Sequence, residues 1–396
     1  SPYFGGGLSG VGFGITLDPR GRVWVGNFGF QAPACGNGMV PPDHPNKIPA
    51  THNSVSLFRS NGVPLSGSQG FTKGHISWPQ ATVSDRKGNI WIANCGNDTV
   101  TIYPKGHPWR SKNISLGGDP LPPLQDPSDP PRIKPFGIAI DPNGNAWVTG
   151  NKSQAVYRIS SHGKVVKLQS DGLISWPMGI SGDSQGNMWV SNSDSVDIPC
   201  NDEIDPQSGE NPSIVLYPAQ GGQPRQFTGG GISIPWGNAV DGNDTLWVFN
   251  FGHNPFNIGQ DFDWPLTALS HFCGTGKCPA GLKVGDPISP STGYTSDALE
   301  RMTGGAVDPS GNLWLLNNWK INAPFTFETN PGGNSFVIVP GAAKPVKTPL
   351  IGPPRTFDNR NRWNGKKVES LSILGLTIPS TVAPLFQFHG LREKPQ

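Results

Sequence analysis

The sequence has few charged residues and no long hydrophobic run. Only 15% of its 396 residues are Asp, Glu, Lys or Arg, against a usual share of about 25%. It contains no stretch of 18 apolar residues, which excludes an ordinary transmembrane helix. The formal net charge is +2 and no run of Lys or Arg occurs, so the composition argues against binding to nucleic acid.

Sequence motifs of common enzyme classes are also missing. There is no GxSxG, no Walker loop and no HExxH, so nothing points to a serine hydrolase, a P-loop nucleotidase or a zinc protease. Glutamate is scarce, and the eight histidines are scattered without a His-x-His pair. An acid–base pair is therefore not visible in the sequence.

What the chain does have is 53 glycines, 42 prolines, 13 tryptophans and 19 phenylalanines. Because the aromatic residues recur at regular places, we interpret the glycines and prolines as turns between many short strands rather than as disorder.

Five cysteines are present. Cys273 and Cys278 have the spacing of a short-loop disulfide, although two free thiols are an alternative. Cys35 and Cys95 follow the same strand position in adjacent repeats, so a second disulfide is expected there, with Cys200 left over. The cysteines, the low charge, the Pro-rich loops and a first residue other than Met favour a secreted or periplasmic location.

A sixteen-residue segment occurs six times: at 14–29, 81–96, 137–152, 179–194, 237–252 and 304–319. Each copy has a short apolar strand, an Asp, a turn such as DPNGN, and a second strand that carries a Trp. The Asp side chain is expected to hydrogen-bond the backbone of the turn, and the Gly to accept a positive φ. The Trp is expected to pack between neighbouring sheets.

A third strand follows each Trp strand, and a fourth, outer strand leads to the next repeat. Six repeats of four strands predict an all-β fold, a six-bladed β-propeller with four-stranded antiparallel blades and long loops on one face. We expect residues 1–352 to form the propeller and residues 353–396 to form a C-terminal extension packed on it.

The repeats, of the form GIAIDPxGNxWVxN, resemble those of NHL-repeat propellers and of virginiamycin B lyase. This resemblance implies a metal-assisted ring-opening lyase with His and Glu at the central funnel. A second resemblance, to gluconolactonase-like propellers, implies a divalent cation on the axis.

Two sets of residues are predicted to share the loop face. The amides at the end of the Trp strands are Asn27, Asn94, Asn151, Asn192, Asn250 and Asn317. The large apolar residues before the first strands are Phe13, Trp78, Phe136, Trp176, Trp236 and Met302. Amides beside aromatic rings suit a small polar ligand or a glycan. The alternatives are that the amides cap their own loops, or that they hold Ca²⁺ with backbone carbonyls.

Four long insertions, 30–53, 193–212, 251–265 and 318–333, gather on this face, where function is expected. The first hypothesis is a propeller that binds a ligand, glycan, peptide or protein partner without catalysis. The alternatives are a metal-dependent lyase or lactonase-type hydrolase with its site in the central funnel, and a structural subunit that self-assembles outside the cell.

Overall fold

In this computed structural model, the described residues are 3, 5–29, 52–117, 133–198, 200, 209, 211–252, 268–319 and 336–346, with four short strand segments between 362 and 378. The predicted loops 30–53, 251–265 and 318–333 lie largely outside these residues, as does Cys35. No helix in the described residues is long and apolar enough to span a membrane.

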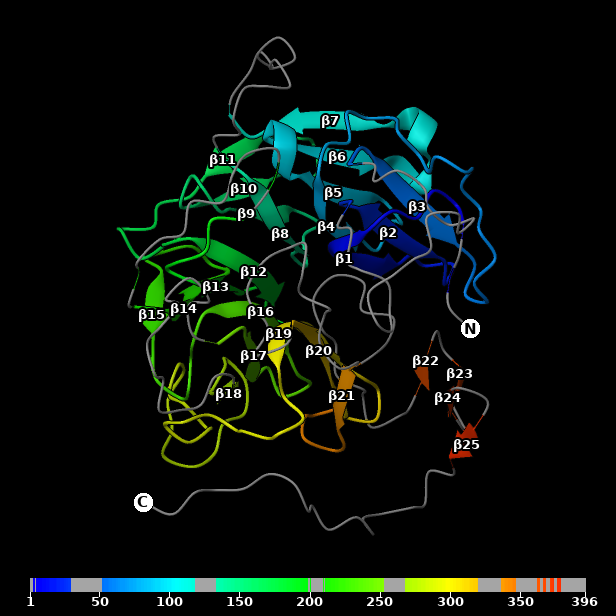
Figure 1. Cartoon of the computed structure of the whole chain (residues 1–396). Helices are drawn as coiled ribbons and strands as arrows, with labels where there is room; N and C mark the ends of the chain where they lie inside the picture. Colours follow the sequence, from blue (N-terminus) through cyan, green and yellow to red (C-terminus); the bar gives the residue numbers. More distant parts are fainter. Residues whose placement is uncertain are drawn as a thin grey trace.

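Six antiparallel sheets of three or four strands surround a common axis (Figure 1). We number them 1 to 6 along the chain. Sheet 1 contains β1 (Val11–Leu17), β2 (Val23–Asn27) and β3 (Ser54–Phe58). Sheet 2 contains β4 (Pro79–Ser84), β5 (Ile90–Asn94), β6 (Thr99–Tyr103) and β7 (Lys112–Ser115). Sheet 3 contains β8 (Pro135–Ile140), β9 (Ala146–Gly150), β10 (Ala155–Ile159) and β11 (Val165–Lys167).

Sheet 4 contains β12 (Pro177–Gly182), β13 (Met188–Asn192), β14 (Ser213–Tyr217) and β15 (Arg225–Phe227). Sheet 5 contains β16 (Pro235–Val240), β17 (Leu246–Asn250) and β18 (Leu269–Phe272). Sheet 6 contains β19 (Arg301–Val307), β20 (Leu313–Trp319) and β21 (Phe336–Val339). The prediction of an all-β propeller is confirmed, with the expected four strands described in sheets 2, 3 and 4.

Three one-turn 3₁₀ helices belong to sheet 2: η1 (Cys95–Asn97), η2 (Pro104–Gly106) and η3 (Pro108–Arg110). Two two-stranded hairpins lie in the predicted C-terminal extension: β22 (Arg362–Trp363) with β23 (Lys366–Lys367), and β24 (Leu371–Ile373) with β25 (Leu376–Ile378). The rest of that extension lies outside the described residues.

The repeated Trp packs against the following sheet. Trp24 lies in one buried cluster with Ile90 and Tyr103 of sheet 2, and Trp91 lies in another with Ile138 of sheet 3. Trp147, Trp189 and Trp247 pack in the same way against sheets 4, 5 and 6. Burying these large rings between sheets supplies much of the hydrophobic stabilisation of the fold.

The repeated Asp holds its own turn, as the sequence predicted. Asp141 Oδ1 accepts hydrogen bonds from Asn143 N and Asn145 N, both at 2.9 Å or less. Its Oδ2 accepts from Trp147 Nε1 at 3.1 Å, which the sequence analysis did not foresee. The same indole bond forms in sheets 1, 2 and 6. In sheets 4 and 5 the Trp189 and Trp247 indole nitrogens have no hydrogen-bond partner in the described part of the chain, and the Asp Oδ2 binds Thr275 Oγ1 or Lys344 N instead.

These contacts define two ends of the propeller. The turn face carries the Asp turns and the turns after the third strands. The loop face carries the connections that leave the second strands and those that enter the first strands.

Candidate functional site: the loop face around the axis

Aromatic rings from sheets 1, 3 and 5 meet on the axis. The ring centroid of Phe13 lies 5.2 Å from that of Phe136 and 5.4 Å from that of Trp236. Phe136 and Trp236 are 6.1 Å apart, and Phe251 lies 4.8 Å from Trp236. Because these sheets are not neighbours, their side chains can touch only at the centre. The rings therefore form an axial plug, defined as Phe13, Phe136, Trp236 and Phe251.

Two polar groups beside this position are buried without a hydrogen-bond partner among the described residues. Gln80 occupies the strand position in sheet 2 that Phe136 and Trp236 occupy in sheets 3 and 5. It is completely buried, and neither its Oε1 nor its Nε2 bonds another described residue. The same is true of the indole nitrogen of Trp236. Sequence reasoning missed Gln80 because a single Gln in a strand gives no pattern.

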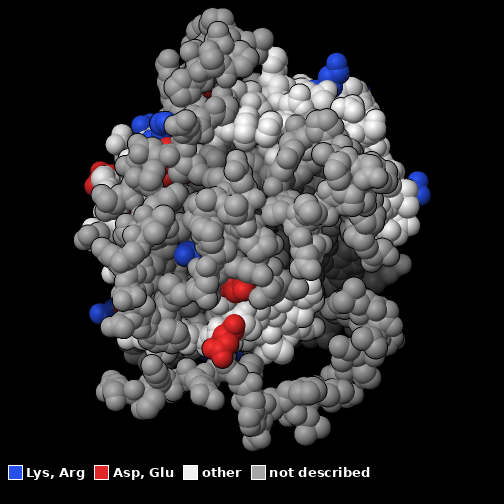
Figure 2. Space-filling model, viewed as in Figure 1, with Lys and Arg blue, Asp and Glu red and all other residues white. Residues whose placement is uncertain are grey.

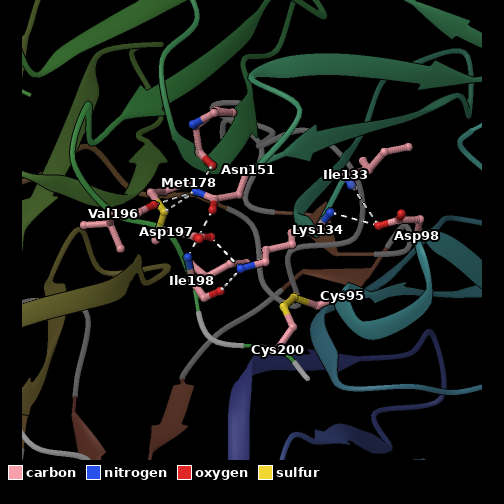
Figure 3. Close-up of a disulfide and its surroundings, with 11 residues drawn as sticks. Cys95, Asp98, Ile133, Lys134, Asn151, Met178, Val196, Asp197, Ile198 and Cys200 are labelled. Carbon is pink, nitrogen blue, oxygen red and sulfur yellow. Dashed lines mark hydrogen bonds and ion pairs between the residues drawn. A yellow bond between two sulfur atoms is a disulfide. The ribbon is translucent and has the colours of Figure 1, made fainter. Parts of the chain in front are cut away.

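A segment that follows β13 crosses from sheet 4 towards sheets 2 and 3 (Figure 3). We call its described residues, 193–198 and 200, the strap. Asn151 of sheet 3 donates from Nδ2 to Val196 O at 2.9 Å and accepts at Oδ1 from Ile198 N at 3.1 Å. A single amide thus satisfies two backbone groups of the strap.

A buried ion pair also holds the strap. Lys134 Nζ lies 2.6 Å from Asp197 Oδ1 and donates to Ile198 O at 2.9 Å (Figure 3). The Lys134 and Asp197 side chains are 0% and 1% exposed. Charges withdrawn from water to this degree need close pairing and further hydrogen bonds, and the bond from Lys134 to Ile198 O is one of these. The sequence analysis did not identify this pair.

A disulfide joins the strap to sheet 2. Cys95 pairs with Cys200, and their Cα atoms are 5.8 Å apart. The expected Cys35–Cys95 pairing is therefore wrong, and Cys200 is not left over. The physical reason is that the strap carries Cys200 across the loop face to Cys95, a path that strand order alone does not reveal. The predicted Cys273–Cys278 disulfide is confirmed.

The predicted amides are buried and connect their own loops. Asn27 Nδ2 donates to Ser54 and Ser56 of β3, while its Oδ1 accepts from Ser9 N. Equivalent bonds fix the side chains of Asn94, Asn192, Asn250 and Asn317. Among the six, only the Oδ1 atom of Asn192 is buried and lacks a partner within the described chain. The amides thus act as internal connectors of the loop face.

The predicted apolar residues occupy three strand positions. Phe13, Phe136 and Trp236 belong to the axial plug, whereas Met302 pairs with Asn317 and lies in the core between sheets 5 and 6. Trp78 and Trp176 lie two positions before the axial position and just before a proline. They share this position with Lys134 and Ile234, and all four have a positive φ between 44° and 51°. We call this the rim position.

The rim position is fixed by backbone hydrogen bonds. The carbonyl of Trp176 accepts from Ser193 N at 3.2 Å and from Ser193 Oγ at 2.8 Å. Corresponding bonds hold Trp78, Lys134 and Ile234. Because a non-glycine residue before proline seldom adopts this conformation, the surrounding structure must impose it. At two rim positions this leaves an indole that is only partly buried.

Two of the described histidines stack on tryptophan rings. His52 stacks on Trp78 with ring centroids 3.7 Å apart, and His271 stacks on Trp247 at 3.8 Å. His271 Nε2 also lies 2.8 Å from Thr245 Oγ1. No group of three or more His, Cys, Asp or Glu side chains that fits a metal ion occurs in the described part of the chain. Arg301 is buried over the Phe251 ring and donates to its carbonyl, and burial lowers the pKa of Arg301 to about 10.

Stability should depend on the titration of His271. Burial lowers its folded pKa to about 4, against an opposing effect of Asp241. The unfolded state therefore binds more protons between pH 6.5 and 4, so stability is present above pH 6.5 and is lost as the pH falls towards 4. Over this pH range the free energy of unfolding should fall by about 3 kcal/mol. Chemical unfolding at a series of pH values should show this slope in the wild type and a flatter one in His271→Phe, which retains the ring stack. Parallel curves would contradict the assignment.

No protein-family model and no curated protein sequence matches the chain. Solved structures do match. A streptogramin B lyase structure shares 14% identity over 78% of this chain and 76% of that chain, with a TM-score of 0.50. A structure of a catalytically inactive virginiamycin B lyase from Staphylococcus aureus with quinupristin shares 16% identity. The match covers 85% of this chain and 86% of that chain, again with a TM-score of 0.50. The calcium-binding protein regucalcin from Agrobacterium tumefaciens shares 14% identity over 87% and 97%, with a TM-score of 0.44.

The fold is that of the virginiamycin B lyase-like propellers. At this level of identity the similarity concerns architecture, because one propeller scaffold supports many unrelated activities.

Proposed function

We propose that the chain is a secreted propeller that binds a ligand or partner on its loop face without catalysing a reaction. The observation that carries this proposal is the indole of Trp176. It is partly exposed on a backbone held by two hydrogen bonds to Ser193, next to the strap. A fixed aromatic ring at a rim binds with a small loss of conformational entropy, and Trp is the residue most enriched at binding hot spots.

The rest of the loop face supports a binding role. The strap is tied to sheets 2 and 3 by a disulfide, a buried ion pair and Asn151. The axial plug and the connector amides hold the centre of the face in one arrangement. A rigid surface of this kind suits a neutral glycan, a peptide or a protein loop. The proposal also takes the six sheets as six blades of a closed ring in residues 1–352, with 353–396 as an extension.

A panel of neutral oligosaccharides and short peptides would test this role. We expect the wild type to bind at least one member, and Trp176→Ala to bind it about tenfold more weakly. Trp109→Ala, which removes an exposed indole on the turn face, is the matched control and should bind like the wild type. Absence of binding to every member, or equal binding by Trp176→Ala, would contradict the proposal.

A metal-dependent lyase or lactonase is the alternative that the fold suggests, and Ca²⁺ on the axis would accompany it. Metal analysis of the purified protein, with lactone and depsipeptide turnover measured with and without chelator, separates the two functions. Turnover that a chelator abolishes would replace the binding proposal. Self-assembly into an extracellular structure would appear as a large species on sizing of the native protein.

A further inference from the structure

The turn face of sheets 1 and 2 is strongly cationic, although the net charge of the whole chain is only +2. The exposed cations are Arg20, Arg59, Arg86, Lys87, Lys105, Arg110 and Lys112. The carboxylates in the described residues of these two sheets are Asp18, Asp85 and Asp98, and each is at most 8% exposed. Within the described part of sheets 1 and 2, exposed cations therefore outnumber exposed carboxylates.

The turns that carry these cations pack into one surface. Lys105 N donates to Asn89 Oδ1 at 2.9 Å, which joins η2 to the Asp85 turn. A Cβ added to Gly106 would lie 2.9 Å from an Arg22 nitrogen, so η2 also lies against the Asp18 turn of sheet 1. Figure 2 looks onto the loop face, and at its upper right margin, where Figure 1 shows β3 and β7, Lys and Arg side chains are visible and no Asp or Glu side chain is.

An exposed aromatic ring lies within this surface. Trp109 is 70% exposed, the highest value among the described large hydrophobic residues. Its backbone is held in η3, where Arg110 N donates to His107 O and Ser111 N donates to Pro108 O. The His107 ring lies 4.7 Å from the indole. A flat apolar ring surrounded by cations matches a sugar ring that bears anionic groups.

We propose that this surface binds an anionic polysaccharide. Arg86, Lys87, Lys105 and Arg110 pair with its carboxylate or sulfate groups, and Trp109 stacks on a sugar ring. The disulfides indicate an oxidising compartment, where polysaccharides are available polyanions. The net charge of only +2 argues against nucleic acid, whose binding depends on neutralising many phosphates. The site is at the opposite end of the axis from Trp176 and does not depend on the loop-face proposal.

The Asp turn of sheet 4 has the same form as the cationic Asp turn of sheet 2 but carries no Lys or Arg. The Asp turn of sheet 2 reads DRKGN, whereas that of sheet 4 reads DSQGN and keeps the same two backbone hydrogen bonds to the Asp Oδ1. Arg86→Ser/Lys87→Gln therefore removes two cations with a turn sequence that this fold already uses. Lys105→Gln removes a third cation from an exposed position.

Binding to polygalacturonate and to heparin should be measured with dextran and oligo(dT) as comparison polymers. The wild type should bind one or both polyanionic polysaccharides, more weakly as salt rises, and should not bind dextran. We expect about tenfold weaker binding for the triple cation variant and about threefold or more for Trp109→Ala, with Trp176→Ala unchanged. The two probes distinguish carboxylate from sulfate recognition. Equal binding by the triple variant, binding to neither polysaccharide, or preferential binding to oligo(dT) would overturn the proposal.

Discussion

Replacement of Lys134 by methionine is expected to destabilise the protein by about 3–5 kcal/mol, because the buried Asp197 carboxylate would lose the ammonium group that forms its ion pair. The ammonium group is its ion-pair partner at 2.6 Å, and neither side chain reaches solvent. The variant also loses the bond from Nζ to Ile198 O, so the strap loses two of its attachments at once. Equilibrium unfolding in guanidinium chloride measures the change.

The double variant Lys134→Met/Asp197→Leu distinguishes the effect of an uncompensated buried charge on stability from the effect of altered packing. Removing both members of a buried pair is often nearly neutral, because no uncompensated charge is left. We therefore expect the double variant to recover most of the stability that the single variant loses. A single variant within about 1 kcal/mol of the wild type would show that the pair does not contribute in this way.

The local rules of the repeat were sufficient to predict the fold. Asp141, Gly144 and Trp147 lie within seven residues, and the turn between two strands determines what each of them does. The Asp side chain bonds the backbone two and four residues on, and Gly144 has a φ of 81°. The same segment recurs six times, so each sheet carries a Trp that is buried only when the next sheet packs against it. A propeller fold provides this packing.

The site was harder to predict, because its contacts join residues far apart in the sequence. Lys134 and Asp197 are separated by 63 positions, and neither belongs to the repeated pattern. The apolar residues before the first strands were grouped as one ring, although Trp176 and Trp236 occupy different strand positions. Trp176 precedes its proline whereas Trp236 follows one, and the positive φ of the residue before each proline is not visible in the sequence.

Removal of the Cys95–Cys200 disulfide should also have a large effect. This bond closes a loop with a sequence separation of 105, whereas the Cys273–Cys278 bond has a separation of 5. In the chain-entropy model, a longer loop restricts the unfolded chain more, which gives about 4.7 kcal/mol for the first bond and about 2 kcal/mol for the second. We expect Cys95→Ala/Cys200→Ala to lose more than twice the stability that Cys273→Ala/Cys278→Ala loses, as measured by guanidinium chloride unfolding.

The two double variants are matched, since each removes one disulfide and replaces two cysteines by alanine. The Cys95–Cys200 variant should also weaken loop-face binding, because the strap would lose its covalent link to sheet 2. Binding at the turn face should be unchanged, since that surface lies at the opposite end of the propeller from the strap. Equal losses of stability in the two variants would contradict the loop-length argument, and loss of polysaccharide binding in the Cys95–Cys200 variant would show that the two ends of the propeller are coupled.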